Sequence, residues 1–148
     1  MQADVEDSLL RRFDPHQNYL WKWNPSRGRS GGLLCGIDIN LYDVGSFKDG
    51  KYMLQLKLWD KTNKIKWNFI NVYGAAQEEN KNEFLAEFAS FCNNMSEPYP
   101  IAGDFNIIRC ASEKNKGGGV HRHAQLFNSI INSLEVAFID TLSCLIPS

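Results

Sequence analysis

The clearest pattern in the sequence is an alternation of apolar and polar residues between positions 51 and 73. From Lys51 to Trp59 every second residue on one face is apolar, and a second apolar run extends from Ile65 to Tyr73. The polar residues 60–64 separate the two runs. Alternation with a period of two is typical of half-buried strands. The pattern predicts an antiparallel hairpin whose second strand, apolar on both faces at its end, finishes inside a sandwich rather than at an edge.

Other segments also have the composition of strands. Residues 18–24 alternate aromatic with other side chains, residues 31–37 form an apolar run, and residues 41–47 form a weaker one. Cys35, in the middle of the second segment, is expected to be a small core residue. The proline-flanked run 99–102 predicts a short buried strand that ends at Gly103, where the backbone can turn without a Cβ penalty.

Three segments show the spacing of amphipathic helices. Residues 4–13 carry apolar side chains on one stripe, which we expect to lie on a sheet. Residues 80–93 begin with Asn80 and Glu83, which resemble a capping box, and continue with a phenylalanine-rich stripe. A last helix is predicted around residues 126–134. Helices mixed with hairpins and strand–helix–strand units predict an α/β sandwich with mixed or antiparallel sheets and the helices outside.

Composition narrows the class of protein. The chain has 148 residues and 43% hydrophobic residues, which favours one folded domain over residues 1–148. The net charge of −1 provides no general attraction for nucleic acid, so any such contact must be local. We expect no membrane span and no signal peptide, and hence an intracellular protein. The four cysteines form no C-x-x-C pair, so a zinc site is not expected.

A polar pair follows the predicted strand at residues 99–102. If the chain stays extended, Asp104 and Asn106 project from one side and Phe105 from the other. The carboxylate would then orient or deprotonate a water, and the carboxamide would hold that water or an oxyanion. From the local sequence alone we favour the alternative, a turn in which both side chains satisfy nearby backbone N–H groups.

Tyr73, at the exit of the hairpin, also has two interpretations. A tyrosine at a strand end is most often an amphipathic core residue with its hydroxyl in water. The alternative is that its hydroxyl points at a substrate phosphate.

Two other groups of residues suggest chemistry but have simpler explanations. Arg27 and Arg29 stand beside glycines, but the segment lacks the spacing of a P-loop, and we favour a solvated turn. His121 and His123 are two residues apart, without a third ligand nearby in sequence, and we favour surface histidines over a metal site.

The order of motifs resembles the endonuclease/exonuclease/phosphatase superfamily. Gly-Gly-Leu-Leu-Cys-Gly-Ile is followed by Asn-Val-Tyr-Gly, a helix, Gly-Asp-Phe-Asn-Ile-Ile-Arg, Glu-Lys and another helix. The sequence is most similar to the endonuclease domain of plant retrotransposons that lack long terminal repeats. The resemblance covers about residues 8–134. It implies a deoxyribonuclease I-like, four-layered α/β sandwich that hydrolyses phosphoesters with a divalent metal, usually Mg²⁺, and DNA as the partner.

The resemblance also implies the roles of individual residues. Asp104 would orient or deprotonate the attacking water, Asn106 would hold that water or a phosphate oxygen, and Tyr73 would hydrogen-bond the scissile phosphate. A substrate-binding residue is expected shortly after Tyr73, but Ala75 and Ala76 stand there.

The chain departs from the family pattern at both ends. The family's early Asn and metal-binding Glu strands have no counterpart, since Glu6 lies in the first predicted helix, and its Ser-Asp-His motif is absent from the divergent tail, residues 135–148. We therefore expect an incomplete sandwich that binds no metal and is catalytically inactive. The alternatives are an active nuclease completed by another chain or exon, and a non-enzymatic module that binds nucleic acid weakly through Arg27, Arg29, Lys114 and Lys116.

Overall fold

The computed structural model describes residues 7–25, 32–97, 99–107 and 121–134. The chain divides into two compact units, Met1–Ile107 and Ile108–Ser148. The first unit contains all the described strands, and the second contains a helix, α3 (His121–Ser133).

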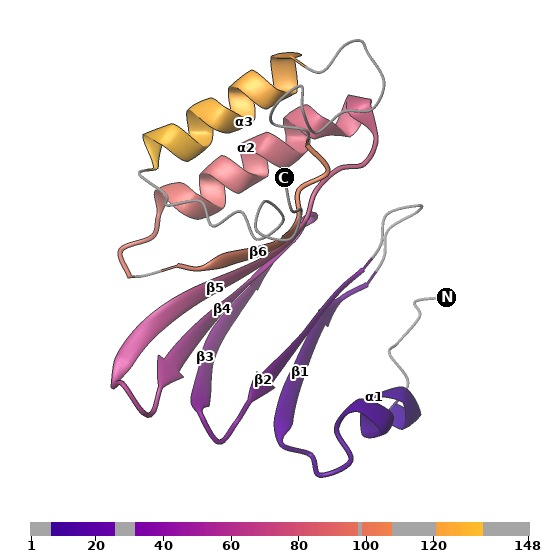
Figure 1. The fold of residues 1–148 in the computed structure, drawn as a ribbon, viewed down its shortest axis with the longest axis vertical. Coiled ribbons are helices and arrows are strands. Elements are labelled where there is room, and N and C mark those ends of the chain that lie inside the picture. Colours follow the sequence, from indigo (N-terminus) through magenta and orange to yellow (C-terminus); the bar gives the residue numbers. More distant parts are fainter. Residues whose placement is uncertain (1–6, 26–31, 98, 108–120, 135–148) are drawn as a thin grey trace, which may run out of the picture. The chain divides into compact units, whose positions relative to one another are not determined.

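The described strands of the first unit form two sheets (Figure 1). A two-stranded antiparallel sheet pairs β1 with β2, and a second sheet has the order β3-β4-β5-β6. In that sheet β3, β4 and β5 are antiparallel neighbours, and β6 runs parallel to β5. The strands are β1 (Tyr19–Asn24), β2 (Leu33–Asp38), β3 (Tyr42–Asp49), β4 (Met53–Asp60), β5 (Ile65–Tyr73) and β6 (Ile101–Asp104).

The predicted hairpin is confirmed as β4 and β5. The two strands pair in continuous register from Met53 opposite Val72 to Asp60 opposite Ile65. Val72 is 1% exposed and β5 lies between β4 and β6, so this strand does end inside the sheet. Period-two alternation identified the hairpin correctly because β4 turns Leu54 and Leu56 toward the apolar layer between the sheets and turns Gln55 and Lys57 toward the opposite face.

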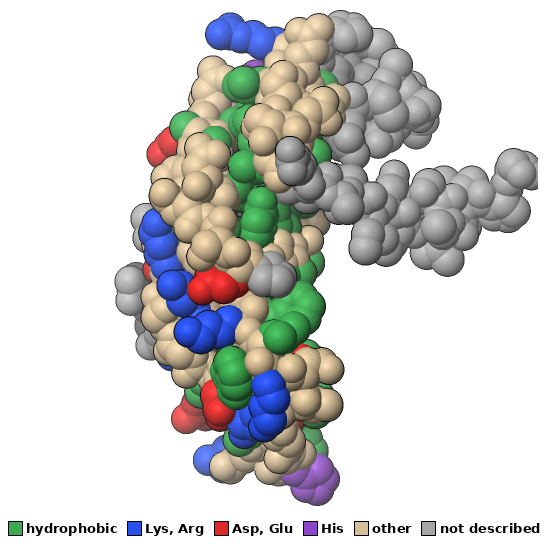
Figure 2. Space-filling model, turned by 90° about the vertical axis from the view of Figure 1, so that its left-hand side faces the viewer, with side chains coloured by type: hydrophobic (Ala, Val, Ile, Leu, Met, Phe, Trp, Pro, Cys, Tyr) green, Lys and Arg blue, Asp and Glu red, His purple; other side chains and the backbone are tan. Residues whose placement is uncertain are grey.

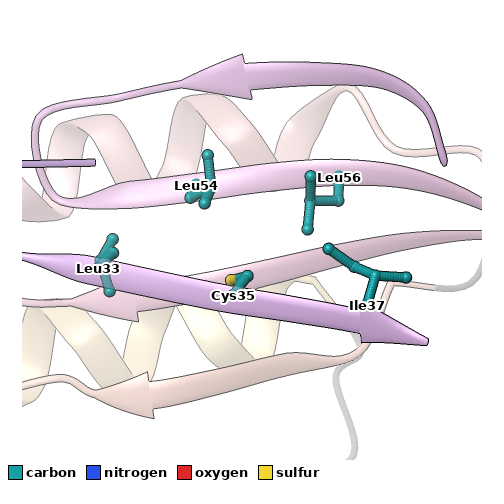
Figure 3. Packing of buried hydrophobic residues seen from close by; sticks show 5 residues of the cluster. All are labelled: Leu33, Cys35, Ile37, Leu54 and Leu56. Atoms are coloured by element: carbon teal, nitrogen blue, oxygen red, sulfur yellow. The ribbon is translucent and has the colours of Figure 1, made fainter. Parts of the chain in front are cut away.

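The two sheets face each other through one layer of apolar side chains (Figure 3). Leu33, Cys35 and Ile37 project from β2 toward Leu54 and Leu56 of β4. All five are less than 9% exposed, so the prediction that Cys35 is a core residue is confirmed. Burial also raises the pKa of the Cys35 thiol, which keeps it in the neutral form.

Helix α2 (Lys81–Asn93) lies along the opposite face of the four-stranded sheet (Figure 1). Its stripe of phenylalanines is buried as predicted, and the ring of Phe84 packs edge-on against Tyr52 with centroids 5.6 Å apart. The predicted capping box is wrong, because Asn80 makes no side-chain cap and ends a short 3₁₀ turn, Glu78–Asn80. Glu83 is instead held by the ammonium group of Lys51 and the hydroxyl of Tyr52.

The first helix, α1 (Asp7–Phe13), does not bury its apolar stripe as predicted. None of its residues is buried, and Leu9 and Phe13 are 45% and 66% exposed. The chain leaves the helix through Asp14, a buried carboxylate that accepts the backbone N–H groups of Asn18 and Tyr19 at 2.8 and 2.9 Å. This local turn fixes the start of β1 although the helix stripe is not buried.

Strand β6 forms where residues 99–102 predicted a strand, but it is not buried. Ala102, Gly103 and Asp104 are exposed and Ile101 is half-buried. Among the described strands β6 stands at the end of its sheet, so only one of its edges is paired. An apolar sequence alone does not distinguish such an edge strand from a central one.

In the second unit, α3 starts earlier than the predicted residues 126–134. Ala124, Phe127 and Ile131 are buried at spacings of three and four, whereas Leu126 is 43% exposed. Several predicted features lie outside the described residues. These are Glu6, Arg27, Arg29, Lys114, Lys116 and the tail 135–148.

We predict that the β4–β5 turn depends on Asp60. Its buried carboxylate accepts the backbone N–H of Asn63 and Thr62, both at 2.9 Å, and the Asn63 side chain at 2.8 Å. The Asn63 bonds, followed by smaller contributions, lower the pKa of Asp60 from its ordinary value of 3.8. Asp60→Ala is expected to lower the melting temperature at pH 7 by about 5 °C.

The contribution of Asp60 to stability is expected to depend on pH. A lowered pKa in the folded state means that Asp60 contributes stability above pH 3.8 and that this contribution is lost as the pH falls below that value. The difference between wild type and variant, followed by circular dichroism, should therefore shrink in acid. Asp43→Ala, which removes an exposed carboxylate from β3, is the matched control; an equal loss in both variants would contradict the assignment.

Candidate functional site

The three residues singled out from the sequence lie together at the ends of two parallel strands. Tyr73 is the last residue of β5 and pairs in register with Asp104, the last residue of β6. Asn106 follows two residues later and is bound to the backbone of Gly74, the residue after Tyr73. Strands that run parallel end at the same edge of a sheet, so pairing of β5 with β6 is what gathers these side chains.

Asp104 and Asn106 form a turn rather than an extended segment. One carboxylate oxygen of Asp104, Oδ1, accepts the backbone N–H of Asn106 at 2.9 Å. Asn106 has a φ of 51°, in the left-handed region, which asparagine tolerates better than most residues. The extended conformation expected for a water-binding pair is thus wrong, and the turn favoured from local sequence is present.

The carboxamide of Asn106 ties this turn to the neighbouring strand. Its Nδ2 donates to the carbonyl oxygen of Gly74 at 2.8 Å, and the Gly74 N–H donates to the Asp104 carbonyl at 2.7 Å. The second carboxylate oxygen of Asp104 accepts no hydrogen bond among the described residues. Asp104 is exposed, so this oxygen is accessible to a water or to a substrate group.

Two glycines allow the strands to approach at this point. A Cβ on Gly103 would overlap the carbonyl of Val72, and Gly103 has a φ of 142° that side chains rarely adopt. A Cβ on Gly74 would overlap the carbonyl of Phe105. Gly74 is a residue that sequence reasoning missed; its only signal was its position directly after the strand-end tyrosine.

Phe105 points away from the polar side chains and anchors the turn. Its ring lies 5.7 Å from that of Phe88 in an edge-on arrangement and 6.5 Å from that of Phe84. Both phenylalanines are fully buried in α2. The expectation that Phe105 projects opposite to Asp104 is therefore confirmed, and the aromatic contact fixes where β6 ends.

Tyr73 shares a face of the sheet with Asp104 because the two residues are paired. Its ring is half-buried against the apolar layer between the sheets, and its N–H donates to the Tyr52 carbonyl at 2.8 Å. Its hydroxyl makes no hydrogen bond in the described part of the chain. The ring thus has the core role proposed from the sequence and leaves a donor for a ligand. Ala75, which is 2% exposed, adds no polar group beside it.

The described residues do not form a cation site. Within residues 7–25, 32–97, 99–107 and 121–134, no three His, Cys, Asp or Glu side chains lie together so that they could hold a metal ion. Mg²⁺ requires hard oxygen ligands in near-octahedral array, and Asp104 and Asn106 supply one carboxylate and one amide oxygen. His121 and His123 lie in the first turn of α3, and the side chain of His121 is outside the described part of the structure. The donor set does not fit a bound Mg²⁺.

Comparison with known proteins identifies the fold. ANGEL2, a 2′,3′-cyclic phosphatase solved with adenosine-2′,3′-vanadate, is 16% identical over 73% of this chain and 38% of its own, with a TM-score of 0.53. It is an enzyme of deoxyribonuclease I-like fold. The chain has a deoxyribonuclease I-like fold. It spans well under half of the length of the ANGEL2 chain.

Weaker structural similarity extends to TDP2 from C. elegans. One TDP2 structure is 18% identical over 71% of this chain and 36% of its own, with a TM-score of 0.47. The structure of a truncated TDP2 is 17% identical over 71% of this chain and 47% of its own, with a TM-score of 0.44. No family model and no curated protein matches the sequence. None of the helices in the described parts of the chain is long and apolar enough to span a membrane.

We predict that Gly103→Ala destabilises the protein by about 2–3 kcal/mol, because a Cβ there requires both a strained backbone and displacement of the Val72 carbonyl. Urea denaturation measures this loss. Gly45→Ala is the matched control, since a Cβ on this β3 glycine meets its nearest atom at 3.4 Å. Equal stability of the two variants would show that the close approach of β5 and β6 is not required.

Proposed function

We propose that this chain carries the phosphate-contacting side of a phosphoester hydrolase site, formed by Tyr73, Asp104 and Asn106. The observation that carries the proposal is their convergence at the ends of two parallel strands in a deoxyribonuclease I-like fold. Ends of parallel strands are where ligands bind in many α/β proteins, because loops there present side chains around a common edge.

Each residue has a chemical role that its surroundings permit. The accessible carboxylate oxygen of Asp104 would accept a proton from, or orient, an attacking water. Asn106 uses one amide hydrogen on Gly74, which leaves its Oδ1 and a second hydrogen for that water or a phosphate oxygen. The hydroxyl of Tyr73 would donate to the phosphate, where negative charge increases in the transition state.

We further propose that these residues alone do not complete a catalytic centre. In-line attack on a phosphodiester requires stabilisation of developing charge, which members of the resembled superfamily obtain from a divalent metal. The described residues bring one carboxylate to this edge and no metal-binding cluster. Each missing electrostatic contribution typically costs several orders of magnitude in rate. The chain by itself is therefore expected to contact phosphoesters without hydrolysing them.

Our proposal for the substrate polymer rests on the order of sequence motifs. Gly-Gly-Leu-Leu-Cys-Gly-Ile, Asn-Val-Tyr-Gly and Gly-Asp-Phe-Asn-Ile-Ile-Arg occur in the order found in plant retrotransposon endonucleases. On this resemblance we propose DNA as the polymer whose phosphates the site contacts.

Hydrolysis is tested with supercoiled plasmid and Mg²⁺. The expected result is that nicking by the wild type does not exceed that by Asp104→Ala. Asp43→Ala, at an exposed carboxylate outside the strand-end site, controls for the loss of a negative charge. Nicking that Asp104→Ala abolishes and Asp43→Ala preserves would refute inactivity and support a site completed by other groups. Nicking that survives Asp104→Ala would refute the site.

Phosphate contact is tested separately, without turnover. Titration of ¹⁵N-labelled protein with a thymidine dinucleotide should shift the side-chain amide resonances of Asn106. Tyr73→Phe, which keeps the ring in the apolar layer and removes the hydroxyl, should weaken this response several-fold. An Asn106 signal that does not move, or that moves equally in Tyr73→Phe, would contradict the assigned roles.

A further inference from the structure

The face of the four-stranded sheet that carries α2 continues beyond the end of the helix. Gln55, Lys57 and Trp59 alternate along β4 and therefore share this face. On β5, Asn68 pairs with Lys57 and Lys66 pairs with Trp59. Beyond Gln55, the surface thus continues in two rows of paired residues, one formed by Lys57 and Asn68 and the next by Trp59 and Lys66.

The last turns of α2 reach only the first row of this surface. The ring of Phe91 lies 4.4 Å below the ammonium group of Lys48, which pairs with Gln55 across β3 and β4. Met95, just after the helix, contacts the Gln55 amide at 3.5 Å. Lys57 and Trp59 lie farther along β4 and are exposed.

This surface is hollowed into two adjoining cavities. The first, of about 330 Å³, lies at the end of α2, and the second, of about 290 Å³, lies over the bulge between Val44 and Phe47 of β3. Ser46, Lys57 and Asn68 line both cavities, so the two are continuous. We call this surface the outer-face groove, formed by Lys48, Gln55, Lys57, Trp59, Lys66 and Asn68.

A chain of hydrogen bonds fixes the polar floor of the groove. The Glu97 carboxylate accepts Asn68 Nδ2 at 2.8 Å, which orients the Asn68 amide. Asn68 Oδ1 then accepts Gln55 Nε2 at 3.1 Å. Asn68 and Gln55 are 1% and 8% exposed. This chain leaves Gln55 Oε1 without a hydrogen-bond donor in the described part of the chain, on a side chain that lines the cavity.

The groove is lined by three lysines and two carboxylates, and its net charge is positive. Lys48, Lys57 and Lys66 form no ion pair among the described residues. Of the two carboxylates that line the groove, Asp43 pairs with Lys61 at 3.3 Å. Glu97 lines both cavities and keeps its charge, because Asn68 offers it only a neutral amide; this hydrogen bond and, to a smaller extent, the nearby Lys57 lower its pKa. Figure 2 shows one face of the molecule, on which basic and acidic side chains are intermixed.

An exposed aromatic ring completes the set. Trp59 is 36% exposed beside Lys66 and lines the second cavity. Aromatic rings flanked by lysines are the elements with which proteins bind unpaired bases and the phosphates that link them. An acceptor such as Gln55 Oε1, which no described donor occupies, suits the N–H donors on a base edge.

We propose that the outer-face groove binds single-stranded nucleic acid. A base stacks on Trp59, a neighbouring base donates to Gln55 Oε1, and Lys48, Lys57 and Lys66 contact the phosphates. The groove does not include Tyr73, Asp104 or Asn106, so the proposal stands independently of the strand-end site.

The test measures binding of a fluorescein-labelled twelve-nucleotide single strand to the full chain by fluorescence anisotropy, between 30 and 200 mM salt. Lys57→Glu combined with Lys66→Glu should weaken binding at least tenfold and reduce the salt slope by about 1.4, the value for two phosphate contacts to a single strand. Trp59→Ala should weaken binding about tenfold with the salt slope unchanged. All substitutions are at exposed positions, and circular dichroism checks the fold.

Arg11→Glu combined with Arg12→Glu, on the exposed helix α1, is the matched charge reversal. It should leave the affinity unchanged. An equal loss in the arginine double variant, or equal competition by polyglutamate, would show attraction by charge alone and overturn the proposal. Absence of measurable binding by the wild type at 30 mM salt would also overturn it.

Discussion

The parallel pairing of β5 with β6 is the interaction on which the candidate site depends. It requires backbone contact closer than a Cβ allows, at Gly103 against Val72 and at Gly74 against Phe105. The aromatic contact of Phe105 with α2 sets the point at which β6 stops. Two close backbone approaches and one aromatic contact thus determine where Asp104 is placed. The polar side chains of Asp104 and Asn106 contribute only the turn that follows.

Much of the fold follows from short-range pattern because β4 carries apolar side chains on the face toward β2 and several polar ones on the opposite face. Period-two alternation is then a direct consequence of this difference between the two faces. The pattern fails where local sequence competes with long-range contacts. Asn80 and Glu83 have the spacing of a cap, yet Glu83 is drawn to Lys51 and Tyr52, which are more than thirty residues away. Sequence spacing carries no information on such partners.

For the candidate site, the sequence predicted which residues come together but not the conformation in which they do so. Asp104 and Asn106 were singled out by residue type, and their neighbour Tyr73 by its place at a strand end. The left-handed conformation of Asn106 could not be deduced, since it depends on the bond from its side chain to Gly74 across the strands. Gln55 and Asn68 show the converse, because alternation makes them look like solvent-facing polar positions, whereas α2 and its following residues bury them.

The roles of Asp104 and Asn106 in the fold bear on how their presence is interpreted. One oxygen of Asp104 closes the turn, and the amide of Asn106 holds the next strand, so both residues serve the structure whether or not any hydrolysis occurs. A Gly-Asp-x-Asn motif is therefore evidence for this strand-end geometry first and for catalysis only second. The distinction lies in atoms that the turn does not use: the second oxygen of Asp104, the amide oxygen of Asn106 and the hydroxyl of Tyr73. These three atoms make no hydrogen bond within the turn. A substitution that removes one of them and leaves the turn intact therefore separates the chemical role of the residue from its structural role.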